Sequence, residues 1–193
     1  MNEEAKTEQP TETAAPATGT ANSRKRKRLI ATLTAAGAVL LILAGVFIHA
    51  ENRAPLWWLK IKANLNSPEA QYQLGCRFSG LENNMAIGYF RQSADNGNAK
   101  GMFRLGWCIL QGIGTDRDRA TAEQWFLRAV PGLRKLAEGG DVHAQRYLGI
   151  CYSTGHGVSR NPPEGEQWLQ KAAGQGDKPA QELLRKLSAP SQN

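Results

Sequence analysis

The stretch that decides the fold is AQRYLGICYSTGHGV, residues 144–158. Its small residue Ala144 is followed four positions later by Leu148 and then by Gly149, and the stretch ends in the Gly-His-Gly sequence at 155–157. Apolar residues three and four positions apart indicate one face of a helix. The paired glycines supply the positive-φ positions that end a helix and turn the chain. We therefore predict a helix followed by a tight turn.

A small residue followed four positions later by leucine occurs four times along the chain. The four copies start at Ala70, Gly101, Ala144 and Ala180, with spacings of 31, 43 and 36 residues. Three residues before each start lies a residue that favours a helix N-cap, namely Ser67, Asn98, Asp141 and Asp177. A period of this length is typical of helical solenoids, in which each copy packs on the next.

A second helix is predicted in each of the first three copies. Apolar or small residues follow Ala86, Ala122 and Gly165 at offsets of 3, 4, 7 and 8, which is one face of a helix. Each full copy is therefore predicted to be a helical hairpin. The second copy carries about seven extra residues around 130–137, where Pro131 is expected to kink or break the second helix.

Glycines inside the predicted first helices suggest close helix packing. Glycine costs about 1 kcal/mol relative to alanine in a helix interior, so Gly75, Gly106 and Gly149 are expected where a helix of a neighbouring repeat comes close. The equivalent residue of the last copy is Arg185. Because no further repeat follows to press against it, we expect the last helix to be a polar terminal cap.

These residues resemble the Sel-one-like repeats, close relatives of the tetratricopeptide repeat. The third copy agrees with that pattern at nearly every defining position, including Trp168 and Leu169, whereas the first copy is degenerate in its turn. The resemblance covers about residues 67–187. It implies an all-α fold, a short α-solenoid of about three helical hairpins plus a capping helix, whose first helices line a groove for peptides or partner proteins.

The first fifty residues predict a membrane anchor. Residues 1–28 begin with 23 residues that hold no aromatic residue and no Val, Ile or Leu, and end in the basic run Arg24 to Arg28, which predicts a disordered cytoplasmic tail. Residues 29–50 hold no Asp, Glu, Lys or Arg and would span about 33 Å as a helix. The alternative is a cleaved signal peptide, which the length of this apolar segment disfavours.

The remaining chain is divided into an interfacial linker over 51–66, a repeat domain over 67–188 and a disordered end over 189–193. Trp57 and Trp58, beside Lys60 and Lys62, suit a membrane interface on the far side of the bilayer. The alternative is that both indole rings pack on the first helix downstream. The sequence leaves the two interpretations open.

Composition and motifs argue against several classes of protein. The net charge is +7, but beyond the tail the charges alternate in sign along the chain, which is not typical of a nucleic-acid protein. His49, His143 and His156 lack partners at metal-ligand spacing, and the glycine pairs join helix to helix without a preceding strand. We expect no enzyme, no cofactor and no metal site.

The chain has three cysteines, Cys76, Cys108 and Cys151, of which Cys108 and Cys151 are expected to be small core residues. Cys108 and Cys151 hold equivalent positions in successive repeats. Their Cα atoms should therefore be roughly 10 Å apart, which is beyond disulfide reach.

A candidate binding surface follows from the first helices. At about 100° per residue, offsets 2 and 6 from each repeat start should point away from the core. These positions hold Tyr72, Phe103, Arg146 and Glu182, then Cys76, Trp107, Ile150 and Lys186. The predicted partner-binding residues are Tyr72, Phe103, Trp107, Arg146 and Ile150. The alternative is that these side chains are covered by a second helix, by the insertion or by the 51–66 linker.

The sequence therefore predicts a single-pass membrane protein that binds an unidentified protein or peptide, as an adaptor, scaffold or regulator. The basic run places the amino terminus in the cytoplasm and the repeat domain on the other side of the membrane. Together with the resemblance, this topology implies a bacterial inner membrane, with the repeat domain periplasmic or otherwise extracytoplasmic. Two alternatives remain: a structural, self-assembling envelope element, and a ligand-binding or enzyme-like domain secreted after signal cleavage.

Overall fold

The computed structural model describes residues 54–188 of the 193-residue chain. The predicted tail, the membrane segment at 29–50 and the disordered end at 189–193 lie outside the described residues. Residues 55–188 belong to one compact unit.

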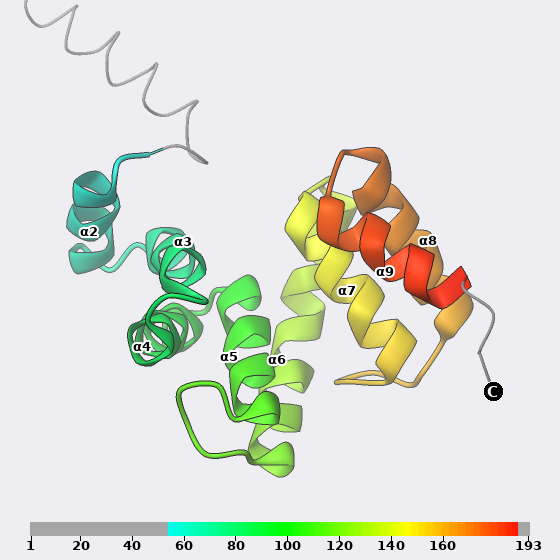
Figure 1. Ribbon diagram of the computed structural model, residues 1–193, viewed down its shortest axis with the longest axis horizontal. Helices are drawn as coiled ribbons and strands as arrows, with labels where there is room; N and C mark the ends of the chain where they lie inside the picture. The colour runs from blue at the N-terminus through cyan, green and yellow to red at the C-terminus, as the bar shows by residue number, and fades with distance from the viewer. Residues whose placement is uncertain (1–53, 189–193) are drawn as a thin grey trace, which may run out of the picture. The chain divides into compact units, whose positions relative to one another are not determined.

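Residues 54–188 form eight α-helices and no strand (Figure 1). The helices are α2 (Leu56–Asn64), α3 (Pro68–Phe78), α4 (Asn83–Asp95), α5 (Ala99–Gln111), α6 (Arg119–Glu138), α7 (Val142–Thr154), α8 (Pro162–Gly174) and α9 (Lys178–Ser188). Each helix packs on the next along the chain, and α3–α4, α5–α6 and α7–α8 form three hairpins. This confirms the prediction of an α-solenoid with a terminal helix.

The four predicted N-caps are all present. The backbone N–H of Ala70 donates to Ser67 Oγ at 3.4 Å, and the equivalent bonds to Asn98, Asp141 and Asp177 are 2.8 to 2.9 Å long. Each bond satisfies an N–H that the first turn of a helix leaves without an intrahelical partner. The start of α3, α5, α7 and α9 is therefore determined by local sequence.

The helix glycines mark close approach within each hairpin. A Cβ at Gly75 would lie 2.5 Å from the Phe90 ring, and a Cβ at Gly149 would lie 2.8 Å from Leu169 Cγ. Phe90 and Leu169 belong to the second helix of the same hairpin, so the expected contact with a neighbouring repeat is wrong. Arg185 on α9 is exposed, and among residues 54–188 no second helix packs over it.

Pro131 does not break α6. The helix runs unbroken from Arg119 to Glu138, and the expected break is wrong. The two turns beyond Pro131 bury Leu133 and Ala137, and burial of these side chains offsets the hydrogen bond that proline cannot make. Seven residues are close to two helical turns, so the insertion keeps the apolar face of α6 in register.

A glutamine joins three pairs of consecutive helices. The side-chain amides of Gln71, Gln145 and Gln181 donate to the carbonyls of Ala63, Ala137 and Ala173, each at 3.1 Å. Helix α2 is thereby bonded to α3 as α6 is to α7 and α8 is to α9. The segment expected to be a linker thus contains a helix, and this helix packs like the second half of an incomplete repeat.

Candidate protein-binding face

The first helices of the three hairpins meet at an aromatic cluster. The hydroxyl oxygens of Tyr72 on α3 and Tyr147 on α7 lie 2.8 Å apart. Between them in sequence, Phe103 on α5 stacks on Tyr147 with ring centroids 4.4 Å apart. Tyr72 and Tyr147 belong to the first and third hairpins, so the repeats curve toward this side until the two hydroxyl groups are within hydrogen-bond distance.

The burial of this cluster contradicts the prediction that all residues at offsets 2 and 6 point into solvent. Tyr72 and Phe103 are only 3% and 2% exposed, so the exposure on which their predicted binding role rested is wrong. The helical wheel showed which side of each helix points away from its own hairpin. Because the repeats curve, that side contacts the first helices of the neighbouring hairpins instead of solvent.

A buried lysine beside this cluster forms ion pairs that connect the three hairpins. The Lys100 ammonium on α5 lies 3.0 Å from Glu69 Oε1 on α3 and 2.9 Å from Asp141 Oδ2 at the start of α7. Burial by itself would lower the pKa of Lys100, but the two carboxylates outweigh it and raise that pKa. Burial would raise the pKa of Asp141, yet hydrogen bonds from Lys100 and the Ala144 N–H lower it. Both groups are therefore charged at neutral pH.

The charged row continues to α9. Arg146 Nε lies 3.4 Å and His143 Nδ1 3.6 Å from the buried carboxylate of Asp177, which is the N-cap of α9. Burial and the neighbouring Arg146 guanidinium lower the pKa of His143. Arg146 thus supports the solenoid as well as lining its surface.

We call five residues of the first helices, each partly or fully exposed, the inner rim. They are Cys76, Arg104, Trp107, Arg146 and Ile150. Four of them come from the sequence stripe, whereas Arg104, at offset 3, was missed. The sequence feature that could have indicated Arg104 is its long basic side chain, which lies next to the apolar positions of α5.

The two rim arginines are held over aromatic rings. The Arg104 guanidinium lies 5.0 Å from the Phe90 centroid and donates to Ser79 Oγ at 3.0 Å. The Arg146 guanidinium lies 4.9 Å from the Tyr147 centroid. Within residues 54–188, Arg104 Nε has no hydrogen-bond partner, and Arg146 Nε has only its 3.4 Å ion pair with Asp177. A flat guanidinium over a ring is rigid, so little side-chain entropy is lost when it meets a carboxylate.

The cysteines differ in their surroundings. Cys108 and Cys151 are buried, as expected for core residues, and burial raises the pKa of Cys151 to about 12. Cys76 is exposed, in agreement with its place at offset 6 of the predicted stripe. Its Sγ nevertheless lies in a partly buried setting, which raises the thiol pKa, although Tyr72 and Arg104 act in the opposite direction.

His156, in the turn between α7 and α8, packs against α6. The His156 ring stacks on Phe126 with centroids 4.7 Å apart, and its Nδ1 lies 3.3 Å from Glu123 Oε2. Among residues 54–188, no three His, Cys, Asp or Glu side chains are grouped so that they could hold a metal ion.

No helix between residues 54 and 188 combines the length and apolar character that crossing a bilayer requires. The predicted anchor at 29–50 lies outside that range.

Comparison with known proteins identifies the repeat. The model of the Sel1 repeat family matches residues 68–98, 99–130 and 142–177. The gap between the second and third matches holds the two extra turns of α6. No curated protein matches the chain.

Three solved structures illustrate the similarity. A Sel1 repeat protein from Oxalobacter formigenes is 29% identical, over 68% of this chain and 97% of that one, with a TM-score of 0.43. A protective antigen of uropathogenic Escherichia coli with an SLR fold is 32% identical, over 67% of this chain but only 27% of that one, with a TM-score of 0.41. Helicobacter pylori cysteine rich protein B is 21% identical, over 70% and 95%, with a TM-score of 0.41.

Proposed function

This chain belongs to the Sel1 repeat family, and on that premise we propose that it is a membrane-tethered module that binds a protein partner along its inner rim. Sel1 repeats generally mediate binding between proteins. The proposed role is that of an adaptor or regulator which acts by binding and carries out no reaction of its own.

The composition of the inner rim is the observation that carries this proposal. Arg104 and Arg146 place two guanidinium groups near Cys76, where both favour its thiolate form. Trp107 and Ile150 leave apolar surface partly uncovered beside them. Arginine and tryptophan are frequent anchors of protein interfaces. A partner segment that combines a carboxylate with an apolar side chain would complement both kinds of surface.

The tether and its orientation rest on the sequence before the described residues. Residues 29–50 are uncharged and long enough to span the bilayer. Arg24 to Arg28 precede them, which favours an amino terminus in the cytoplasm. The repeat domain would then face the periplasm of a bacterial cell.

Photo-crosslinking in the native cells tests the binding face. We expect a photoreactive phenylalanine analogue in place of Ile150 to give one discrete adduct, because this position lies on the rim. The same analogue in place of Leu127, which is 50% exposed on α6, should give none. Arg104→Glu should lower the adduct yield at position 150 roughly tenfold, because it reverses a charge that faces the partner.

Circular dichroism of each purified variant provides the control for folding. An Arg104→Glu protein with the helix content and melting temperature of the wild type would show that only binding has changed. Equal adducts from positions 150 and 127, or an unchanged yield in folded Arg104→Glu, would refute the inner rim as the binding face.

Cys76 reports the orientation of the domain. In spheroplasts, a maleimide that does not cross membranes is expected to label the wild-type chain once and a Cys76→Ser chain not at all, because Cys108 and Cys151 are buried. The thiolate is the reactive form, and the thiol pKa is raised, so labelling should accelerate as the pH rises from about 7 to 9. Labelling that appears only after lysis would place the repeats in the cytoplasm and contradict the proposed orientation.

A further inference from the structure

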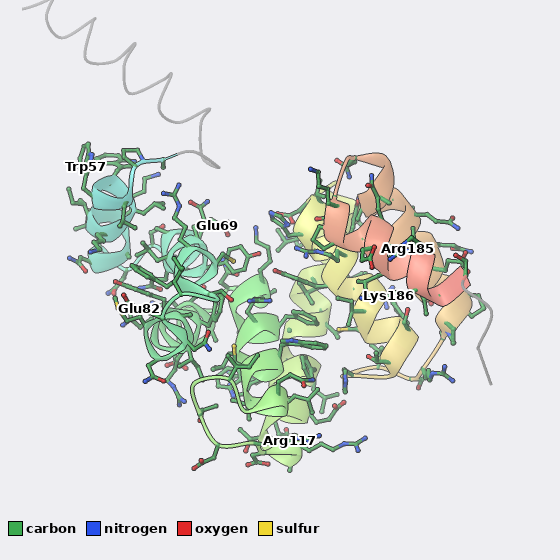
Figure 2. The ribbon with its side chains drawn as sticks, viewed as in Figure 1. Trp57, Glu69, Glu82, Arg117, Arg185 and Lys186 are labelled. Carbon is green, nitrogen blue, oxygen red and sulfur yellow. The ribbon has the colours of Figure 1, made fainter. Side chains whose placement is uncertain are left out.

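Helix α2 has two dissimilar faces. Leu59 and Ala63 are 2% and 4% exposed, because they pack on α3. The opposite side carries Trp57, Ile61 and Leu65, which are 60%, 45% and 77% exposed. Trp57 and Ile61 are four residues apart on one side of α2, and Leu65, the C-cap residue, continues this stripe at the end of the helix. Figure 2 shows Trp57 on the side of α2 that is turned away from α3.

Basic side chains border this stripe on both sides. At 100° per residue, Lys60 and Lys62 lie about 100° to either side of Ile61. The Lys62 ammonium lies 5.8 Å from the Trp58 ring centroid, and Trp58 itself is half-buried. The sequence left two interpretations for this pair of tryptophans, and the structure gives a different one for each residue. Trp58 is turned toward the protein, whereas Trp57 is turned away from it.

The position of α2 along the chain limits what can cover the stripe. Five residues separate Ala50, the end of the uncharged segment, from Leu56, the start of α2. Six extended steps reach about 20 Å at most. If residues 29–50 cross the bilayer, α2 begins within that distance of the point where the chain leaves the hydrocarbon.

From these observations we propose that α2 lies in the bilayer interface, with Trp57, Ile61 and Leu65 inserted among the lipids and Lys60 and Lys62 at the headgroups. A short apolar stripe with tryptophan and flanking lysines is the composition that this interface favours. Because α2 packs on α3 as the second helix of an incomplete repeat, its insertion would set the orientation of the whole solenoid on the membrane. This inference rests on the proposed tether.

Spin labels on the full-length chain test the insertion. The chain is reconstituted into vesicles of three parts phosphatidylcholine to one part phosphatidylglycerol, and a nitroxide is attached at Ile61→Cys or Leu65→Cys in a Cys76→Ser background. Leu127→Cys on α6 is the matched control, because Leu127 is exposed to a similar degree, 50% against 45% for Ile61. The ratio of oxygen to nickel-chelate accessibility is expected to be roughly tenfold higher at position 61 than at position 127.

Flotation with alkaline extraction distinguishes failure of the proposed insertion of α2 from failure of the proposed membrane tether. If the chain resists extraction but the label at position 61 is as accessible to the nickel chelate as the label at 127, α2 is not inserted and the tether stands. If the label reports lipid but alkali releases the chain, α2 is inserted and the tether is wrong. If the chain does not float, both are wrong. Spin–spin broadening at position 61 without lipid exposure would mean that a second copy covers the stripe, which also overturns the inference.

Discussion

Replacing Phe103 with alanine is expected to lower the free energy of unfolding by about 3 to 5 kcal/mol. The ring is 2% exposed, and it stacks on Tyr147 and lies 5.5 Å from the Phe126 centroid. Its removal would leave a cavity where the first helices of three hairpins meet. Because an ordinary domain is stable by about 5 to 15 kcal/mol, this loss is a large share of the total.

Urea unfolding of the full-length chain in detergent, followed by circular dichroism, measures this loss. Leu127→Ala is the control, and we expect a change below about 1 kcal/mol because its side chain is half exposed on α6. Phe103→Leu should lie between the two, since it keeps much of the buried volume. A Phe103→Ala chain that unfolds at the wild-type midpoint and fails only to bind a partner would restore the exposed stripe predicted from the sequence.

Replacing Gly157 with alanine is expected to cost about 3 kcal/mol or more, because it combines two penalties. The backbone φ of Gly157 is +67°, a conformation that residues with a Cβ rarely adopt. An added Cβ would lie 2.5 Å from the carbonyl carbon and 2.7 Å from the carbonyl oxygen of Phe126. These are backbone atoms of α6 in the preceding hairpin, so the third turn and the second hairpin would have to move apart.

Gly176→Ala separates the two penalties. Gly176 has a φ of +86° but no atom within 4 Å of the position of an added Cβ, so its substitution should cost only the conformational term, about 1 to 2 kcal/mol. Thermal melts of the two variants give the difference directly. Equal losses at both positions would show that Gly157 is required for its backbone conformation and not for contact between hairpins.

The sequence was sufficient to predict the helical-hairpin repeat because each hairpin is a local structure. The N-cap residue, the leucine four residues beyond each repeat start and the paired glycines of a turn lie within about fifteen residues of one another. Their roles depend on backbone conformation and on one neighbouring helix. The same locality accounts for Arg185, which is exposed on a terminal helix as expected.

Features that depend on several local rules acting together were harder to predict. Proline in a helix is unfavourable by itself, yet α6 continues beyond Pro131 because the burial of Leu133 and Ala137 stabilises its last two turns. The Ala-Gln pair that begins three of the four repeats was present in the sequence. Only the bond from Gln71 to the Ala63 carbonyl showed that this glutamine joins a repeat to the helix before it, and that α2 acts as such a helix.

By itself, the sequence determined that the chain contains helical hairpins and where they begin. Only the tertiary structure decided which surface remains open. Tyr72 is buried and its hydroxyl meets that of Tyr147, 75 residues further on, because the solenoid curves. This curvature is the sum of small rotations between successive repeats. A helical wheel treats one helix at a time and contains no information on those rotations. It therefore predicted the hairpins correctly and the exposure of Tyr72 and Phe103 wrongly.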